Sequence, residues 1–134
     1  MAEQTDVELR IGRAIAELQA RYYGRAPARV YTQVSDTIVV VILEETFSMA
    51  ERTLIEREEA GGIQDIRRRF QRVQADEFKA VVENLTGRNV RSFVSDTDLK
   101  ENISIEIFLL AGALEDMAAF EREIELQGSG PQEA

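Results

Sequence analysis

Residues 28–44 read ARVYTQVSDTIVVVILE, and they include the most apolar run of the chain, Ile38–Leu43. The first part, Val30–Val34, keeps Val, Thr and Val at alternate positions, which is typical of a strand buried on one face. The second part is apolar at every position and mostly β-branched, which is typical of a strand covered on both faces. Ser35 and Asp36 separate the two parts and are common turn residues. The stretch therefore predicts a β-hairpin around which the fold is built.

Two capping boxes predict helix starts. In each, a hydroxyl and a Glu three residues later satisfy backbone amides of the first helical turn. The pairs are Thr5 with Glu8 and Ser48 with Glu51. The first helix is expected to end near Gly24 and to lay its apolar stripe on the sheet. The second is short, is broken by Gly61–Gly62, and is expected to turn Ala50, Leu54 and Ile55 inward.

The longest predicted helix begins at Ile63 and ends at Thr86, before Gly87. Its apolar side chains recur at helical spacing, which predicts a stripe that faces the core. The expected stripe consists of Ile63, Ile66, Phe70, Val73, Val81 and Leu85, flanked by Phe78 and Val82.

Two later strands, Val90–Val94 and Ile103–Leu109, predict a second hairpin. In the last strand Ile side chains alternate with Ser104 and Glu106, so we expect these polar side chains to face water. The dipeptide Gly-Arg precedes both hairpins, at 24–25 and at 87–88. The pattern predicts one helix-strand-strand unit used twice, with chance similarity of short turn sequences as the alternative.

The predicted fold class is α+β. Two helix-strand-strand units form a four-stranded antiparallel sheet with helices packed on a face, plus a C-terminal helix. We expect a single domain over 1–127, with the appended helix at 113–127 and a disordered tail at 128–134. If helices cover one face only, three side chains of Ile38–Leu43 face water, at a cost of about 1.5–3 kcal/mol each. A homodimer is the expected remedy, and the C-terminal helix is the alternative cover.

The composition argues against most catalytic and metal chemistry. The chain has no His and no Cys, which removes His-dependent catalysis, imidazole and thiolate metal sites, and disulfides. A net charge of −9 argues against nucleic acid as a partner. The N-terminus lacks the pattern of a secretory signal, and no apolar run approaches the roughly 20 residues of a membrane span. We expect a cytoplasmic protein that has no cofactor, is not an enzyme and does not insert into a membrane.

Four arginines are candidate contacts for an anion or a protein partner: Arg25, Arg68, Arg72 and Arg88. Arg68 and Arg72 lie one turn apart on the long helix, and Arg25 and Arg88 follow the glycines of the two repeated joints. Guanidinium groups match the geometry of carboxylates and phosphates. The alternative is a solvated helix face that nearby aspartates neutralise through pairs along the helix.

The loop from Asp96 to Glu101 gathers three carboxylates, which Ca²⁺ or Mg²⁺ could use. It lacks the remaining ligands of a calcium-binding loop, and its residues are common in turns. We therefore interpret it as a hairpin turn and expect no metal.

A succession of short motifs carries a family resemblance. The motifs are Tyr22-Tyr23-Gly24-Arg25-Ala26-Pro27, the apolar strand, the helix around Ser48–Leu54, Arg67-Arg68-Arg69-Phe70, and Leu85-Thr86-Gly87 with Val90. Over about 7–110 this succession resembles the MpsC-like family, small bacterial proteins named for a Na⁺-translocating, membrane-potential-generating system. Family members often carry Gly-Arg-Gly-Pro at the first joint, where this chain has Ala26. The resemblance implies a soluble accessory protein of membrane cation or inorganic-carbon uptake, and it supplies no catalytic residues.

The leading hypothesis is a non-enzymatic accessory or regulatory module that binds a protein partner, such as a membrane transport subunit. The alternative is a small-ligand sensor that binds an anion or a nucleotide in a cleft between the sheet and the long helix. An enzyme that relies on carboxylates alone is the third class.

Overall fold

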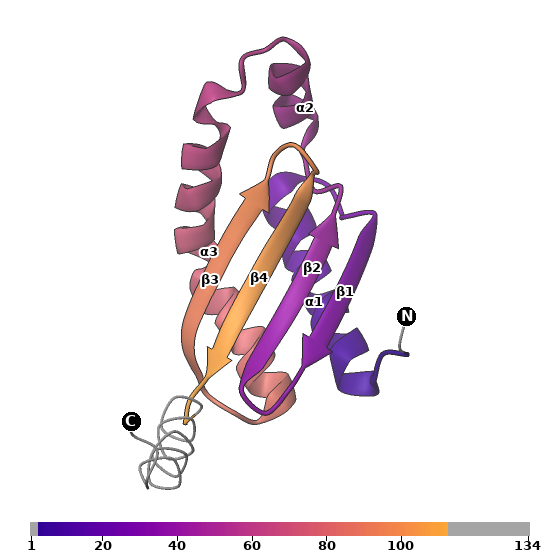
Figure 1. Ribbon diagram of the computed structural model, residues 1–134, viewed down its shortest axis with the longest axis vertical. Coiled ribbons are helices and arrows are strands. Elements are labelled where there is room, and N and C mark those ends of the chain that lie inside the picture. Colours follow the sequence, from indigo (N-terminus) through magenta and orange to yellow (C-terminus); the bar gives the residue numbers. More distant parts are fainter. Residues whose placement is uncertain (1–2, 113–134) are drawn as a thin grey trace, which may run out of the picture.

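The computed structural model describes residues 3–112, which form a four-stranded antiparallel sheet with α1 and α3 on one face (Figure 1). The elements are α1 (Asp6–Tyr23), β1 (Arg29–Val34), β2 (Ile38–Glu44), α2 (Met49–Glu56), a 3-10 turn (Ala60–Gly62), α3 (Ile63–Thr86), β3 (Val90–Asp98) and β4 (Ile103–Leu110). The α+β class is thus confirmed. The helix predicted at 113–127 and the tail predicted at 128–134 lie outside the described residues.

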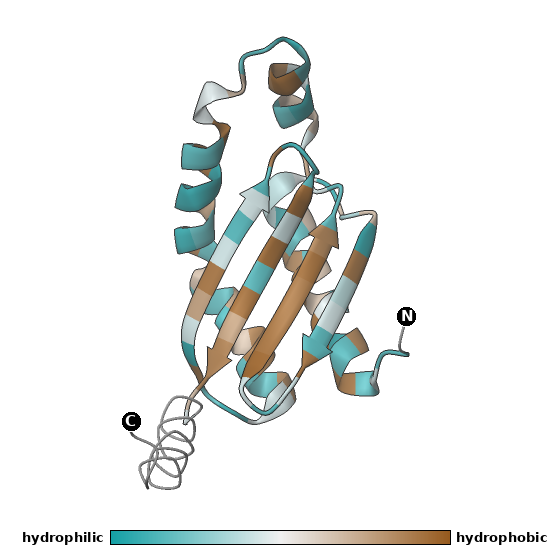
Figure 2. Ribbon diagram, in the orientation of Figure 1, coloured by the Kyte–Doolittle hydropathy of each residue, from teal (hydrophilic) through white to brown (hydrophobic). Residues whose placement is uncertain are grey.

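The apolar strand β2 lies in the middle of the sheet. The strand order is β1-β2-β4-β3, so β2 pairs with both β1 and β4, and every pairing is antiparallel. The register places Val40 opposite Gln33 on one side and Ile107 on the other. Figure 2 shows β2 as apolar along most of its length. The hairpin predicted at 28–44 therefore supplies one edge and one central strand.

The helices begin and end at the predicted capping residues. The Glu8 amide donates to Thr5 Oγ1 at 3.2 Å, and the Thr5 amide donates to Glu8 Oε1 at 2.9 Å. α2 has the same capping box. Gly24 after α1 and Gly87 after α3 are left-handed, with φ of 74° and 72°. Because glycine adopts this conformation without a steric penalty, both glycines turn the chain from a helix into the next strand.

The core lies between the sheet and helices α1 and α3. It is built from Ile11, Ile15, Leu18, Val39, Val41, Leu43, Phe78, Val82, Phe108 and Leu110. Gly12 brings α1 close to β1, since a Cβ there would lie 3.0 Å from Thr32 Oγ1. These helices cover one face of the sheet.

The predicted direction of the β4 side chains is wrong. Ser104 and Glu106 are 1% and 2% exposed, because they face the helices rather than water. The alternate positions lie on the opposite face, where Ile105 is 39% exposed. The inward polar positions meet Arg67 of α3, whose Nη1 donates to Ser104 Oγ at 3.3 Å.

The predicted stripe of α3 is wrong at Ile66, Phe70 and Val73 and confirmed at Ile63, Val81 and Leu85. Ile66, Phe70 and Val73 are 50%, 38% and 70% exposed. Val81 and Leu85 pack against the core. The buried positions of the helix are Ile63, Arg67, Gln74, Phe78 and Val82.

The inward face of α2 also differs from the prediction. Its buried side chain is Glu51, whereas Ala50 and Leu54 are exposed and Ile55 is half-buried. The predicted inward faces of α2 and α3 are wrong for one physical reason. The charged pair of Glu51 and Arg67 lies between the two helices, where an apolar contact was expected.

Candidate functional site

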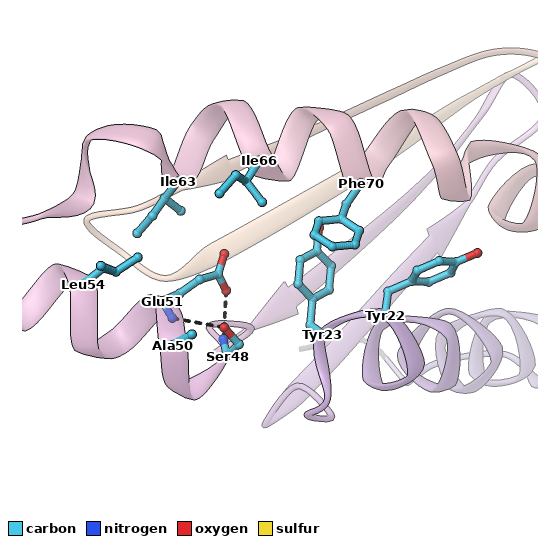
Figure 3. Close-up of a pocket in the computed structure, with 9 residues that line it drawn as sticks. All are labelled: Tyr22, Tyr23, Ser48, Ala50, Glu51, Leu54, Ile63, Ile66 and Phe70. Atoms are coloured by element: carbon cyan, nitrogen blue, oxygen red, sulfur yellow. Dashed lines mark hydrogen bonds between the residues drawn. The ribbon is translucent and has the colours of Figure 1, made fainter.

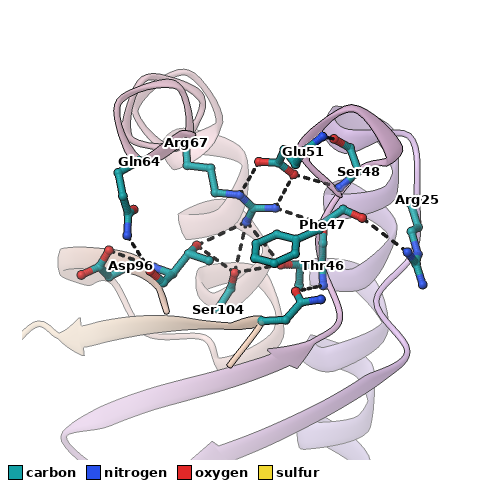
Figure 4. A network of polar contacts seen from close by, with 11 residues as sticks. Arg25, Thr46, Phe47, Ser48, Glu51, Gln64, Arg67, Asp96 and Ser104 are labelled. Atoms are coloured by element: carbon teal, nitrogen blue, oxygen red, sulfur yellow. Dashed lines mark hydrogen bonds and ion pairs between the residues drawn. The ribbon is translucent and has the colours of Figure 1, made fainter. Parts of the chain in front are cut away.

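A buried arginine ties α3 to α2. Arg67 is 1% exposed, and its Nε donates to Glu51 Oε2 at 2.6 Å while its Nη2 donates to Glu51 Oε1 at 2.8 Å. This is the two-bond geometry in which a guanidinium matches a carboxylate. Figure 4 shows the pair, with Thr46 and Ser104 below the guanidinium group.

The remaining donors of Arg67 are also used within the chain. Its Nη2 donates to the Thr46 carbonyl at 3.1 Å. Its Nη1 lies 3.3 Å from the hydroxyls of Thr46, Thr97 and Ser104. The rings of Tyr23 and Phe47 lie 4.6 and 5.4 Å from the guanidinium carbon, within cation–π range. A buried charge is tolerated when it is paired and hydrogen-bonded in this way.

Glu51 is held in its ionised form. Burial raises the pKa of its carboxyl, but the hydrogen bonds from Arg67 and from the Ser48 amide outweigh burial, so the net pKa lies below the ordinary value. The Ser48 amide donates to Oε1 at 2.8 Å. One carboxylate therefore both caps α2 and neutralises Arg67.

A second carboxyl, Glu106, is buried without such compensation. Burial raises its pKa to about 7, against smaller opposing effects from the Ser95 hydroxyl and the Arg67 charge. Its Oε2 has no hydrogen-bond partner in the part of the chain that the structure describes. Burial also raises the pKa of the nearby Tyr23 hydroxyl to about 12.

An apolar pocket of about 250 Å³ lies between α1, α2 and α3 (Figure 3). Its walls are Tyr22, Tyr23, Ser48, Ala50, Glu51, Leu54, Ile63, Ile66 and Phe70. The rings of Tyr23 and Phe70 meet at 5.4 Å between centroids. Because the Glu51 carboxylate already binds Arg67 and Ser48, the pocket offers a ligand mainly apolar contacts.

A groove of about 360 Å³ runs between α3 and β3. It is lined by Arg68, Gln71, Arg72, Ala75, Phe93, Val94 and Ser95. The structure thus brings together two of the four arginines singled out from the sequence. Within residues 3–112, Arg68 and Arg72 form no ion pair, so the neutralisation by nearby aspartates that the sequence allowed is not formed.

The other two candidate arginines lie at opposite ends of the sheet. Arg25 follows α1, and its Nη1 donates to the Phe47 carbonyl at 3.5 Å. Arg88 follows α3, and it donates to the Asp36 carbonyl through Nη1 and to the Ala111 carbonyl at 3.1 Å through Nη2. Both side chains contact backbone of neighbouring segments, so they are not part of the groove that holds Arg68 and Arg72.

The face of the sheet that carries no helix is apolar at its centre, where β2 and β4 lie. From the register, its large apolar side chains are Tyr31, Ile38, Val40, Ile42, Val94, Ile103, Ile105, Ile107 and Leu109. Val94 is 58% exposed. Its charged side chains are Arg29 and Glu44, which pair with each other, Asp96 and Asp98 on β3, and Arg91 at the bulge of β3 beside Ser92.

The segment interpreted as a turn, Asp96 to Glu101, turns only in its second half, because β3 extends to Asp98. Asp98 Oδ1 accepts hydrogen bonds from the amides of Lys100 and Glu101 at 3.0 and 3.1 Å. Residues 3–112 contain no group of three side chains of the kinds that hold a metal ion.

Sequence reasoning missed the central residues of the interior: Glu51 as a partner, Arg67 and Glu106. Arg67 lies four residues after Ile63 and seven before Gln74, so it does share the inward face of α3. The helical spacing of Ile63, Arg67 and Gln74 was the signal that could have identified Arg67. We assigned the inward position to the neighbouring Ile66 because its side chain is apolar.

Comparison with known proteins identifies a family and no individual relative. The family model described as "Na⁺-translocating membrane potential-generating system (MpsC)" matches residues 3–112. The searches of curated proteins and of solved structures gave no match. Over the described range, no helix combines the length and apolar character that crossing a bilayer requires. Since the match covers most of the sequence, the chain belongs to the MpsC family.

Proposed function

We propose that the chain is a non-enzymatic accessory or regulatory module that acts in the cytoplasm by binding other proteins, and that it does so as a homodimer. The observation that supports this most directly is the apolar, helix-free face of the sheet. The family description refers to a Na⁺-translocating system, which supports our choice of a membrane cation-transport subunit as the partner class, and we extend that class to inorganic-carbon transport.

The size of the helix-free face favours association. Four strands about 4.8 Å apart and about 24 Å long present roughly 450 Å² of flat surface. An apolar patch that approaches this size is comparable with the largest patch on a typical monomer, and such patches are often interaction sites. Two such faces packed about 10 Å apart would remove the apolar side chains of both copies from water.

The interior chemistry favours a structural rather than a catalytic role for the charged residues. Every nitrogen of the Arg67 guanidinium contacts an acceptor within the chain, and Glu51 is occupied by Arg67 and Ser48. These groups therefore stabilise the joint between α2, α3 and the sheet.

The homodimer can be tested by placing a charge on the helix-free face. Light scattering of the unmodified chain should give twice the monomer mass of 15.1 kDa at micromolar concentration. Val40→Lys should give 15.1 kDa, because a lysine at the centre of the face would be desolvated in a dimer. Val73→Lys is the matched control, since Val73 is 70% exposed on α3, and it should keep the mass of the unmodified chain.

Two outcomes would contradict this arrangement. A monomer mass for the unmodified chain would refute the homodimer. A Val40→Lys variant that keeps the dimer mass would move the interface away from the sheet.

The second candidate function is a sensor for a small anion or nucleotide. The α3–β3 groove favours it because it lies between the long helix and the sheet and is lined by Arg68 and Arg72, which form no ion pair within the described range. Inorganic phosphate or ATP should then raise the melting temperature of the unmodified chain, because a ligand stabilises the state that it binds. Arg68→Glu/Arg72→Glu should abolish the rise. A flat thermal-shift response to both anions would argue against the sensor.

A further inference from the structure

We propose that the groove between α3 and β3 is the docking site of the chain's own acidic segment at 113–127. This inference goes beyond the proposed homodimer and leaves the helix-free face available to a second copy. It rests on the arginines of the groove, its apolar floor, the composition of the segment and the place where the chain leaves the sheet.

The groove carries concentrated, uncompensated positive charge in an acidic protein. Arg68 and Arg72 line it, and Arg69 lies between them on the same helix. All three are exposed, and none forms a hydrogen bond or ion pair within the described range. The net charge of the whole chain is −9, so such a cluster is unusual here. Guanidinium groups that are free and one turn apart suit carboxylates spaced along a peptide.

The floor of the groove is apolar. Ala75 contributes from α3 and the Phe93 ring from the edge strand β3, while Val94 borders the groove with its side chain on the helix-free face. An occupant that combines apolar side chains with carboxylates therefore fits better than a small inorganic anion, which would leave this floor in water.

The segment at 113–127 has that combination. It reads ALEDMAAFEREIELQ and contains five acidic residues against one arginine, a net charge of −4. Its large apolar residues are Leu114, Met117, Phe120, Ile124 and Leu126. The family match ends at residue 112, so both the segment and the contact that we infer are additions to the shared domain.

The chain leaves the sheet within reach of the groove. β4 ends at Leu110, and Val94 of the groove lies opposite Ile107, three residues earlier. That is a displacement of about 10 Å along the strand, and β3 is directly adjacent to β4 at about 4.8 Å. Fifteen residues span about 22 Å even at the short rise of a helix. The segment can therefore reach Arg68 and Arg72 of its own copy.

Charge also favours the groove over the centre of the helix-free face as the place for this segment. The face carries Asp96 and Asp98, the mutually paired Arg29 and Glu44, and, at the bulge of β3 beside Ser92, Arg91, which has a contact of its own. Asp96 and Asp98 would repel an acidic segment, whereas Arg68 and Arg72 of the groove would attract it. We therefore assign the sheet to the second copy and the groove to the acidic segment.

Hydrogen–deuterium exchange of the full chain tests the inference. Amides of 113–127 should exchange at least tenfold more slowly than an unstructured peptide of the same sequence. Arg68→Glu/Arg72→Glu should remove this protection while peptides from α1 and β2 keep theirs, which shows that the fold is intact. Arg13→Glu/Arg57→Glu changes the net charge equally at two exposed arginines elsewhere, and it should preserve the protection.

The Val40→Lys variant separates this inference from the homodimer. Protection of 113–127 should persist in that variant whether or not it is monomeric, because the contact lies within one copy. Unprotected amides in the unmodified chain, protection that survives Arg68→Glu/Arg72→Glu, or protection that disappears in Val40→Lys would each overturn the docking site.

Discussion

Arg67→Ala should lower the free energy of unfolding by about 3–5 kcal/mol, the cost of leaving one member of a buried ion pair without its partner. The substitution removes both hydrogen bonds to Glu51, whose residue is 9% exposed, and leaves the hydroxyls of Thr97 and Ser104 without this donor. Urea denaturation at neutral pH measures the effect as a lower midpoint.

The two neighbouring arginines supply the control for this prediction. Arg68→Ala and Arg69→Ala remove the same side chain at exposed positions of the same helix, and each should change the unfolding free energy by less than about 0.5 kcal/mol. If Arg67→Ala were as mild as these two, the buried pair would not hold α2 and α3 together.

Removing both charges should cost less than removing one. Glu51→Gln/Arg67→Met leaves no unpaired buried charge, and Met fills much of the volume of the arginine stem. The double variant should therefore be more stable than Arg67→Ala. It should remain below the unmodified chain, because the hydroxyls that contact Nη1 lose their donor. A double variant no more stable than Arg67→Ala would locate the cost in packing rather than in charge.

The sequence predicts much of this fold because the signals are local. Capping boxes at Thr5 and Ser48 and glycines at 24 and 87 set the helix ends through backbone geometry within a few residues. The apolar run Ile38–Leu43 marks a central strand through its own composition.

The orientation of the polar side chains is not predictable in this way. A period of two states which residues of β4 share a face, but not which face meets the helices. The Ile positions of β4 are the more apolar set, yet Ser104 and Glu106 point inward because Arg67 lies above them. Along α3, Ile66 and Arg67 are adjacent, and the choice between them depends on Glu51 sixteen residues earlier. Such a contact between distant segments leaves no periodic trace in the sequence.

The candidate arginines also divide into those whose placement local sequence predicts and those whose placement it does not. The spacing of Arg68 and Arg72 predicts a shared helix face, and both line one groove. Arg25 and Arg88 were joined to them through a repeated dipeptide, which sets backbone geometry at two joints at opposite ends of the sheet. Equivalent positions in a repeat are related by topology and need not be close in space.

Glu106→Gln should remove most of the pH dependence of stability between pH 5 and 8. The folded pKa of Glu106 is about 7, and the ordinary value that we take for the unfolded chain is 4.5. The folded state therefore binds more protons over this interval, so stability falls as pH rises above 4.5 and the loss is complete above about 7. The shift corresponds to roughly 3 kcal/mol at pH 8. Glutamine has a similar shape and no charge, so the variant should be more stable than the unmodified chain by about that amount at pH 8, with little difference at pH 4.5.

The groups around Glu106 add little to the pH dependence of stability between pH 5 and 8. Burial raises the pKa of Tyr23 on α1 to about 12, and hydrogen bonds hold the pKa of Glu51 on α2 below its ordinary value. The chain has no His, the side chain that ordinarily titrates in this range. Urea midpoints at half-unit steps of pH give the two curves, and Glu101→Gln, at an exposed loop position, should follow the unmodified chain. Parallel curves for Glu106→Gln and the unmodified chain would mean that Glu106 is already ionised in the folded protein at pH 5.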